Sequence, residues 1–199
     1  GPAMRLRSLA LVLAAGLAAS LVAAAPAQAG PDDVTKPATG SFTFVTGNGV
    51  LPTWSLDDLV IIGVVPGNVV TTSMGTKARV TLPVVARTGS AIAAAGGFRI
   101  NNVMSGATFR CSTPTIDVRA NIVDCVVLGG DSLQLFAITS LGTRTKIVGT
   151  STITEFYRGL TMRVNGQRAA DLLNKTLGVS SFSPSVTVGI ADLIVTQSK

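Results

Sequence analysis

Short runs rich in Val, Ile, Thr and Phe, each ended by Gly, Pro, Asn or Asp, follow one another along most of this chain. The first begins at Ser41, and clear later examples span 133–139 and 185–195. β-branched and aromatic residues favour strands, whereas glycine and proline favour the turns between them. The pattern predicts roughly eleven to thirteen short strands, at the spacing typical of a sandwich or a barrel. The expected fold class is therefore all-β.

Three segments carry more specific predictions. Residues 59–65 form a continuous apolar run, which is typical of a strand buried on both faces. Pro83 has no N–H to donate, so its strand is expected to lie at an edge or to carry a bulge there. Residues 167–177 place alanine and leucine near helical spacing and are followed by Gly178, which predicts one short packing helix with Asn165 as a candidate cap.

The start of the chain has the composition of a secretory signal peptide. Residues 4–7 are basic, 8–25 are uncharged and mostly Leu, Val and Ala, and Ala27-Gln28-Ala29 offers small residues before Gly30. We therefore expect residues 4–29 to be removed and the protein to be secreted, extracellular or attached to the cell surface. The alternative for 8–25 is a membrane span, for which the run is about long enough. Residues 1–3, Gly-Pro-Ala, are expected to be the scar of a tag-cleaving protease.

The rest of the chain is expected to hold a flexible leader over 30–40 and a single domain over 41–199. The formal net charge of +6 falls to +4 once Arg5 and Arg7 are removed. The remaining basic residues are scattered singly with little aromatic interleaving, which argues against nucleic-acid binding. A weak contact with anionic wall polymers or lipid head groups is one alternative, and a solvated sheet face is the other.

The chain contains no histidine. This excludes histidine-based acid–base catalysis, the Ser-His-Asp arrangement and most zinc, copper and haem-iron sites. Glu155 is the sole glutamate, and Asp57 and Asp58 are adjacent, so in a strand they would face opposite sides. No nucleophile elbow, phosphate loop or dinucleotide fingerprint is present. We therefore expect no enzymatic activity, no metal site and no cofactor.

Two cysteines, Cys111 and Cys125, are present. In a secreted chain a single pair of cysteines predicts one disulfide, and these two lie on neighbouring strand-like segments. Two buried free thiols are the alternative.

Three aromatic residues are candidates for a ligand site. Trp54 lies in a presumed loop before a strand, where it could stack on sugars, insert into a membrane or close the end of the core. Phe156 and Tyr157 stand together at a strand end, where packing is the alternative to ligand binding. Tyr157 is the sole tyrosine of the chain.

Stretches 40–49, 79–100 and 160–195 resemble secreted actinobacterial domains of the HtaA type. The match is best in the last stretch, where Leu173-Asn174-Lys175-Thr176-Leu177-Gly178 precedes a Val-rich terminal strand. The resemblance implies an immunoglobulin-like antiparallel β-sandwich with one short helix near the C-terminus. Some members of that family bind haem through tyrosine assisted by histidine. This chain departs from that pattern, because Tyr157 has no histidine to assist it and the family's N-terminal tyrosine motif has no counterpart.

These observations favour a secreted, non-enzymatic domain that binds a cell-wall or surface component, or that associates with itself. The alternative is an extracellular carrier of a small apolar ligand such as haem or a lipid.

Overall fold

A computed structural model describes residues 34–72 and 74–199 of the chain. The expected signal peptide, the tag scar and residues 30–33 of the expected leader lie outside the described residues. None of the described helices is long and apolar enough to span a membrane.

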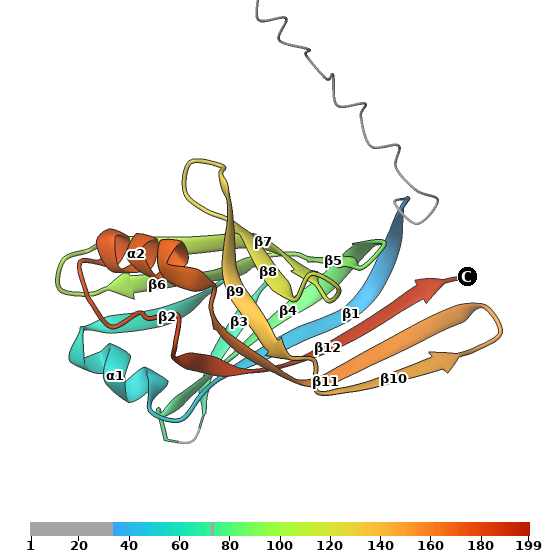
Figure 1. The fold of residues 1–199 in the computed structure, drawn as a ribbon, viewed down its shortest axis with the longest axis horizontal. Helices are drawn as coiled ribbons and strands as arrows, with labels where there is room; N and C mark the ends of the chain where they lie inside the picture. Colours follow the sequence, from blue (N-terminus) through green and yellow to red (C-terminus); the bar gives the residue numbers. More distant parts are fainter. Residues whose placement is uncertain (1–33, 73) are drawn as a thin grey trace, which may run out of the picture. The chain divides into compact units, whose positions relative to one another are not determined.

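Twelve strands form one hydrogen-bonded sheet in which every pairing is antiparallel. The elements in chain order are β1 (Thr35–Thr46), α1 (Val50–Leu56), β2 (Leu59–Val64), β3 (Asn68–Thr72), β4 (Lys77–Thr88), β5 (Ala91–Ala94), β6 (Gly97–Asn102), β7 (Thr108–Asp117), β8 (Ile122–Val126), β9 (Ser132–Ser140), β10 (Thr143–Val148), β11 (Thr152–Val164), α2 (Gly166–Leu177) and β12 (Thr187–Ser198). The pairing order β7-β5-β4-β1-β12-β11-β9-β8 returns to β7, so eight strands form a closed ring (Figure 1). Strands β2 and β6 extend from β7 outside the ring, while β10 and β3 attach to β11 and β4.

The all-β prediction is confirmed, and the expected immunoglobulin-like sandwich needs correction. A sandwich stacks two separate sheets, whereas here the β7–β8 pairing joins the ends of a single sheet. Strand alternation is the same in both architectures, so the sequence pattern could not separate them. Within residues 34–72 and 74–199 there are two helices, where one was expected.

Side chains fill the interior of the ring. Phe42 and Phe44 of β1 point inward, and Phe44 lies 5.9 Å from Phe136 between ring centroids. Phe98 of β6 stacks on Phe136, with 6.2 Å between ring centroids. An eight-stranded ring is just wide enough for side chains to fill, and this core leaves the two ends of the ring as the places where a ligand could enter.

Strand β1 begins earlier than the sequence indicated. Residues 35–40 were expected in a flexible leader, but residues 35–37 pair with β4 and residues 38–40 pair with β12. Gly40 lies at a shift in register between Pro37 and Ser41, with φ +134°. A Cβ at Gly40 would collide with the backbone carbonyl of Ile194, so this close strand approach requires glycine.

The structure decides between the alternatives at Pro83 and corrects the prediction for 59–65. Strand β4 pairs with β1 along one side, and its other side is shared by β3 and β5. Pro83 falls between the β3 and β5 pairings, beside a bulge, so its missing N–H interrupts no ladder. Strand β2 ends the pairing path instead of lying inside it, and of its residues only Leu59 is buried.

The two helices lie at the same end of the ring (Figure 1). α2 confirms the predicted helix, and Gly178 ends it in the left-handed conformation; Asn165 occupies the cap position without a side-chain capping bond. α1 was not predicted, because seven residues are too few to show a period. Buried Asn102 joins both helices to β6: its Nδ2 donates to the carbonyl of Leu177 at 3.1 Å and to that of Asp57 at 3.4 Å.

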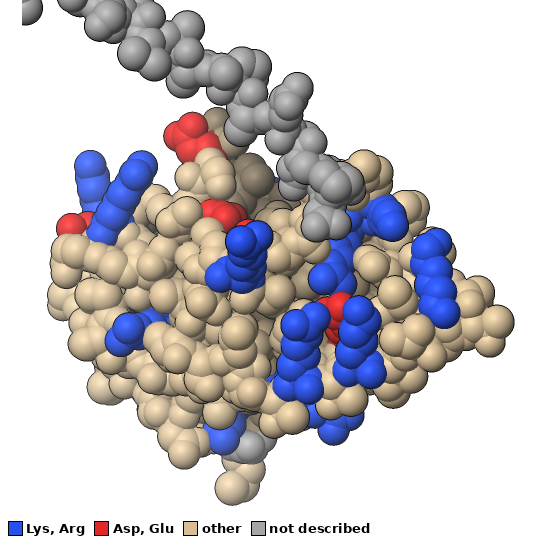
Figure 2. Space-filling model, turned by 45° about the vertical axis from the view of Figure 1, so that its right-hand side comes forward, with Lys and Arg blue, Asp and Glu red and all other residues tan. Residues whose placement is uncertain are grey.

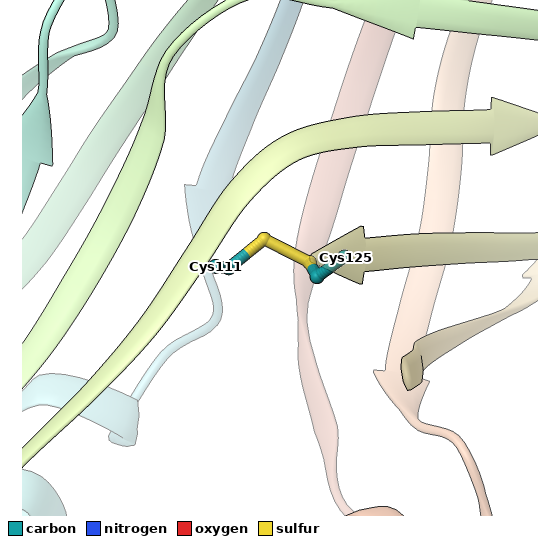
Figure 3. The surroundings of a disulfide bond; sticks show 2 residues. All are labelled: Cys111 and Cys125. Carbon is teal, nitrogen blue, oxygen red and sulfur yellow. A yellow bond between two sulfur atoms is a disulfide. The ribbon is translucent and has the colours of Figure 1, made fainter. Parts of the chain in front are cut away.

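The predicted disulfide is confirmed between Cys111 of β7 and Cys125 of β8 (Figure 3). Their Cα atoms lie 5.1 Å apart, and both residues are almost fully buried. The covalent bond therefore sits at the pairing that closes the ring.

Replacing both cysteines with serine should lower the free energy of unfolding by about 3 kcal/mol, because a loop of this length constrains the unfolded chain by about that much. Urea denaturation of the oxidised protein and the double variant would measure the difference. A reducing agent should destabilise the parent and leave the variant unchanged. Identical urea midpoints for the parent and the variant would show that the bond does not support ring closure.

Candidate functional site

A basic hollow lies at the end of the ring away from the two helices. There β1 and β11 begin, β4 and β12 end, and the hairpin β10–β11 and the turns after β4 and β7 come together (Figure 1). The hollow has a volume of about 680 Å³. Its charged lining residues, which we call the basic mouth, are Lys36, Arg87, Asp117, Arg119, Arg144, Lys146 and Glu155. Figure 2 shows basic side chains gathered around an acidic one on this part of the surface.

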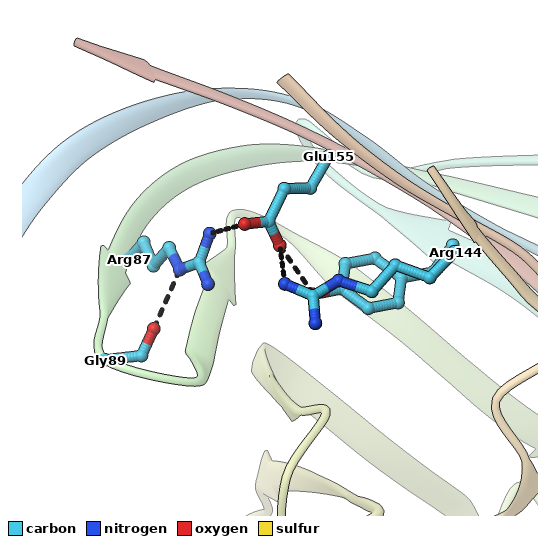
Figure 4. Close-up of polar contacts among 5 residues, drawn as sticks. Arg87, Gly89, Arg144 and Glu155 are labelled. Carbon is cyan, nitrogen blue, oxygen red and sulfur yellow. Dashed lines mark hydrogen bonds and ion pairs between the residues drawn. The ribbon is translucent and has the colours of Figure 1, made fainter. Parts of the chain in front are cut away.

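Glu155 contacts Arg87, Arg144 and Tyr157 at the base of the basic mouth, and we call these four residues the floor of the mouth (Figure 4). Its carboxylate is 3.3 Å from the guanidinium of Arg87 through Oε1 and 3.1 Å from that of Arg144 through Oε2. The hydroxyl of Tyr157 donates to Oε2 at 2.6 Å. The side chain of Glu155 is 4% exposed, that of Arg87 15% and that of Arg144 56%. A buried carboxylate is thus paired with one partly buried and one solvent-facing arginine.

Strand register explains why these groups meet. In the β10–β11 hairpin, Arg144 lies opposite Tyr157 and Lys146 lies opposite Glu155. Directly opposite residues of antiparallel strands share a face, so all four side chains point to the same side. The guanidinium of Arg144 also lies over the ring of Tyr157, at 5.4 Å from its centroid. Arg87 arrives from β4, where its Nε donates to the carbonyl of Gly89 at 2.7 Å and fixes its direction.

The electrostatics of the floor favour an ionised Glu155 and a neutral Tyr157. Burial alone would raise the pKa of Glu155, but the Tyr157 hydrogen bond and the charges of Arg87 and Arg144 outweigh it, so the pKa is lowered. Burial, together with the hydrogen bond to the Glu155 carboxylate, raises the pKa of Tyr157 to about 12. Tyr157 therefore keeps its proton at neutral pH.

Asp117 has a structural role at the rim. Among the described residues both ion pairs involve Glu155, and Asp117 has no part in either. Asp117 instead accepts hydrogen bonds from the backbone N–H groups of Arg119 and Ala120 and from the hydroxyl of Ser90, each at 2.9 Å. It thereby fixes the turn after β7, from which Arg119 enters the mouth.

The three aromatic candidates are not brought together. Tyr157 faces the ring interior under the mouth, whereas its neighbour Phe156 points to the opposite face and packs against Arg158. Trp54 lies on α1 instead of a loop, at the helix end of the ring, and its ring packs at a tilt against that of Phe182, with 5.4 Å between centroids. It is 7% exposed, so its indole closes that end of the core and offers little surface for stacking on a sugar.

Sequence reasoning missed the basic mouth, because its basic residues are spread from 36 to 146 over separate strands and turns. One local signal was present: the sole glutamate and the sole tyrosine are two residues apart, and on a strand that spacing places them on one face.

Comparison with known proteins shows the class of fold. No protein-family model and no curated protein matches the chain. Among solved structures, the fold is similar to that of the haem-binding protein HtaB from Corynebacterium glutamicum, with a TM-score of 0.50 and 14% identity over 83% of this chain and 96% of that one. The C-terminal domain of HtaA from the same organism aligns with a TM-score of 0.40 and 10% identity over 80% of this chain and 98% of that one. The resemblance to HtaA-type domains is therefore confirmed as a likeness of fold.

Replacing Glu155 with glutamine should destabilise the protein by about 3 kcal/mol near neutral pH, because Arg87 loses its buried partner. The lowered pKa of Glu155 means that its ionised form stabilises the fold above the ordinary glutamate value of 4.5. This contribution is lost as the pH falls through the lowered pKa. Urea denaturation across this range should show the gap between parent and variant closing at low pH; a constant gap would contradict the pKa assignment.

Because Tyr157 is the sole tyrosine, its titration directly tests the hydrogen bond between Tyr157 and Glu155. Ultraviolet absorbance of tyrosinate should give a midpoint near 12 in the folded protein. In the Glu155→Gln variant the midpoint should move toward 10.0, the ordinary value, because the carboxylate charge is removed. Circular dichroism at each pH would check that the chain stays folded. A midpoint near the ordinary value in the folded parent would show that Tyr157 is not bound to Glu155.

Proposed function

We propose that this protein is a secreted, non-enzymatic carrier whose basic mouth binds a small ligand through carboxylate or similar anionic groups. The observation that carries the proposal is the charge of the mouth, which has five basic and two acidic side chains. Glu155 is already paired with Arg87 and Arg144. Lys36, Arg119 and Lys146 form no ion pair among the described residues, so their charges remain available to an anion.

The size of the hollow fits a small molecule. Ligand sites of proteins commonly measure about 300–1,000 Å³, and the mouth lies within that range. Its mixed lining of charged, polar and apolar groups suits a ligand with a carbon framework and anionic substituents. The expected signal peptide supports export, and the use of the sole glutamate as an ion-pair partner supports a binding role over acid–base catalysis.

The likeness of fold to haem-binding HtaB supports the carrier hypothesis more than the self-associating surface domain. Haem is a candidate cargo on chemical grounds too, because its two propionate carboxylates match the exposed cations of the mouth. Ligation of the iron by Tyr157 does not fit this chain: the phenol is 2% exposed, donates to Glu155 and keeps its proton. We infer that the carboxylates of the ligand, and not a bond to a metal, provide the affinity.

Titration with ferric and with metal-free protoporphyrin IX tests this function. Both porphyrins should bind with similar affinity, because the contacts are made to the propionates. The double variant Arg119→Gln/Lys146→Gln should bind both at least about tenfold more weakly, since each charged contact removed corresponds to about that factor.

The matched control is Arg79→Gln/Arg163→Gln, which removes the same charge outside the mouth. If the control variant binds the porphyrins as weakly as Arg119→Gln/Lys146→Gln, the loss of affinity reflects only the lower net charge of the protein and not a contact in the basic mouth. A strong preference for the ferric porphyrin would contradict the charge-based mode. If neither porphyrin binds, haem is not the cargo; if native mass spectrometry of protein secreted by its own host then also finds no small ligand, the carrier function is wrong.

A further inference from the structure

Two arginines face each other on the outside of the sheet, away from the basic mouth. Arg99 of β6 and Arg110 of β7 are directly opposite in the antiparallel register. The residues flanking each arginine along the chain, such as Phe98 and Phe109, are buried in the core, so strand alternation turns both guanidinium groups outward. Ile62 of β2 lies opposite Arg99 on its other side and extends the same row.

This pairing is unfavourable in the free protein. Like charges directly opposite each other on neighbouring strands repel, and opposite charges or polar pairs are the stabilising choices. Neither arginine has a hydrogen bond or an ion pair with any described residue, and both known ion pairs lie in the mouth. The two groups line a hollow of about 430 Å³ together with Gly63, Val64, Thr108 and Leu128. The unpaired charges therefore face a space large enough for another molecule.

We propose that Arg99 and Arg110 form a second binding site, which takes a phosphoryl group between the two guanidinium planes. The planar fork of arginine matches the oxygens of a phosphate in bidentate geometry. A phosphate dianion would neutralise both charges and turn the repulsion into two attractive contacts. Val64 and the 84% exposed Leu128 at the rim would contact the carbon part of a phosphate ester.

The site is independent of the proposed carrier function. No residue lines both hollows, and neither Arg99 nor Arg110 contacts the Glu155 network. Loss of one site should therefore leave the other intact.

Inorganic pyrophosphate at low ionic strength is the first probe, with calorimetry to measure affinity and backbone NMR shifts to locate binding. Saturable binding should shift the amides of β6 and β7. Arg99→Gln and Arg110→Gln should each weaken it about tenfold, the effect of losing one charged contact. Arg79→Gln removes the same charge from β4 and should bind like the parent, as should Arg119→Gln/Lys146→Gln. Equal weakening by Arg79→Gln, or the absence of saturable binding, would overturn the proposal.

Arg110→Glu separates a lost site from a damaged fold. It places opposite charges across the β6–β7 pair, so the melting temperature should rise while pyrophosphate binding disappears. Binding that survives in this variant would overturn the site.

Vesicle binding identifies the source of the phosphoryl group. If the protein co-sediments with phosphatidylglycerol vesicles but not with phosphatidylcholine vesicles, and if Arg110→Glu abolishes this co-sedimentation, the site is supported and its ligand is a lipid head group. Pyrophosphate binding without vesicle binding would support the site with a soluble phosphate ester.

Discussion

The pairing of β7 with β8 is the constraint on which the rest of this structure depends. It joins the two ends of an eight-strand path, so the backbone groups of both strands are satisfied and neither remains a free edge of the ring. The Cys111–Cys125 bond lies at this seam and makes the closure covalent. Without the seam, β7 and β8 would each lose one neighbour, and the core around Phe136 would be open to water on that side.

A closed ring has two ends, and this chain treats them differently. α1, α2 and Trp54 cover one end with apolar side chains, tied to the sheet through Asn102. The other end is left polar, and a carboxylate is buried there. Burying a charge is costly unless it is paired and hydrogen-bonded, and Glu155 has two guanidinium groups and a phenol for this purpose. The end of the ring away from the helices is therefore the one whose side chains can hold charges in partly buried positions.

Local features of the fold were predictable from the sequence. The alternation of β1 and β12, the leucine spacing of α2 before Gly178 and the disulfide follow from residue types and from the expectation of export. Ring closure was not predictable, because the same alternation serves a sandwich. The apolar run in β2 was misread as buried, since nothing local shows that its outer face borders Arg99. The basic mouth depends on register between distant strands, and in the sequence its charges look scattered.

A shared fold does not transfer a ligand set, because binding depends on the particular side chains a scaffold carries. The HtaB-like fold here has no histidine and a single tyrosine whose hydroxyl supports a buried glutamate. Releasing Tyr157 for a metal would break its bond to Glu155 and weaken the pairing with Arg87 and Arg144 on which the floor depends. Among the described charged residues of the basic mouth, those that have no ion pair and no side-chain hydrogen bond are the cations Lys36, Arg119 and Lys146. These cations support the proposed recognition of an anionic ligand by charge, and Tyr157 is already occupied by its hydrogen bond to Glu155.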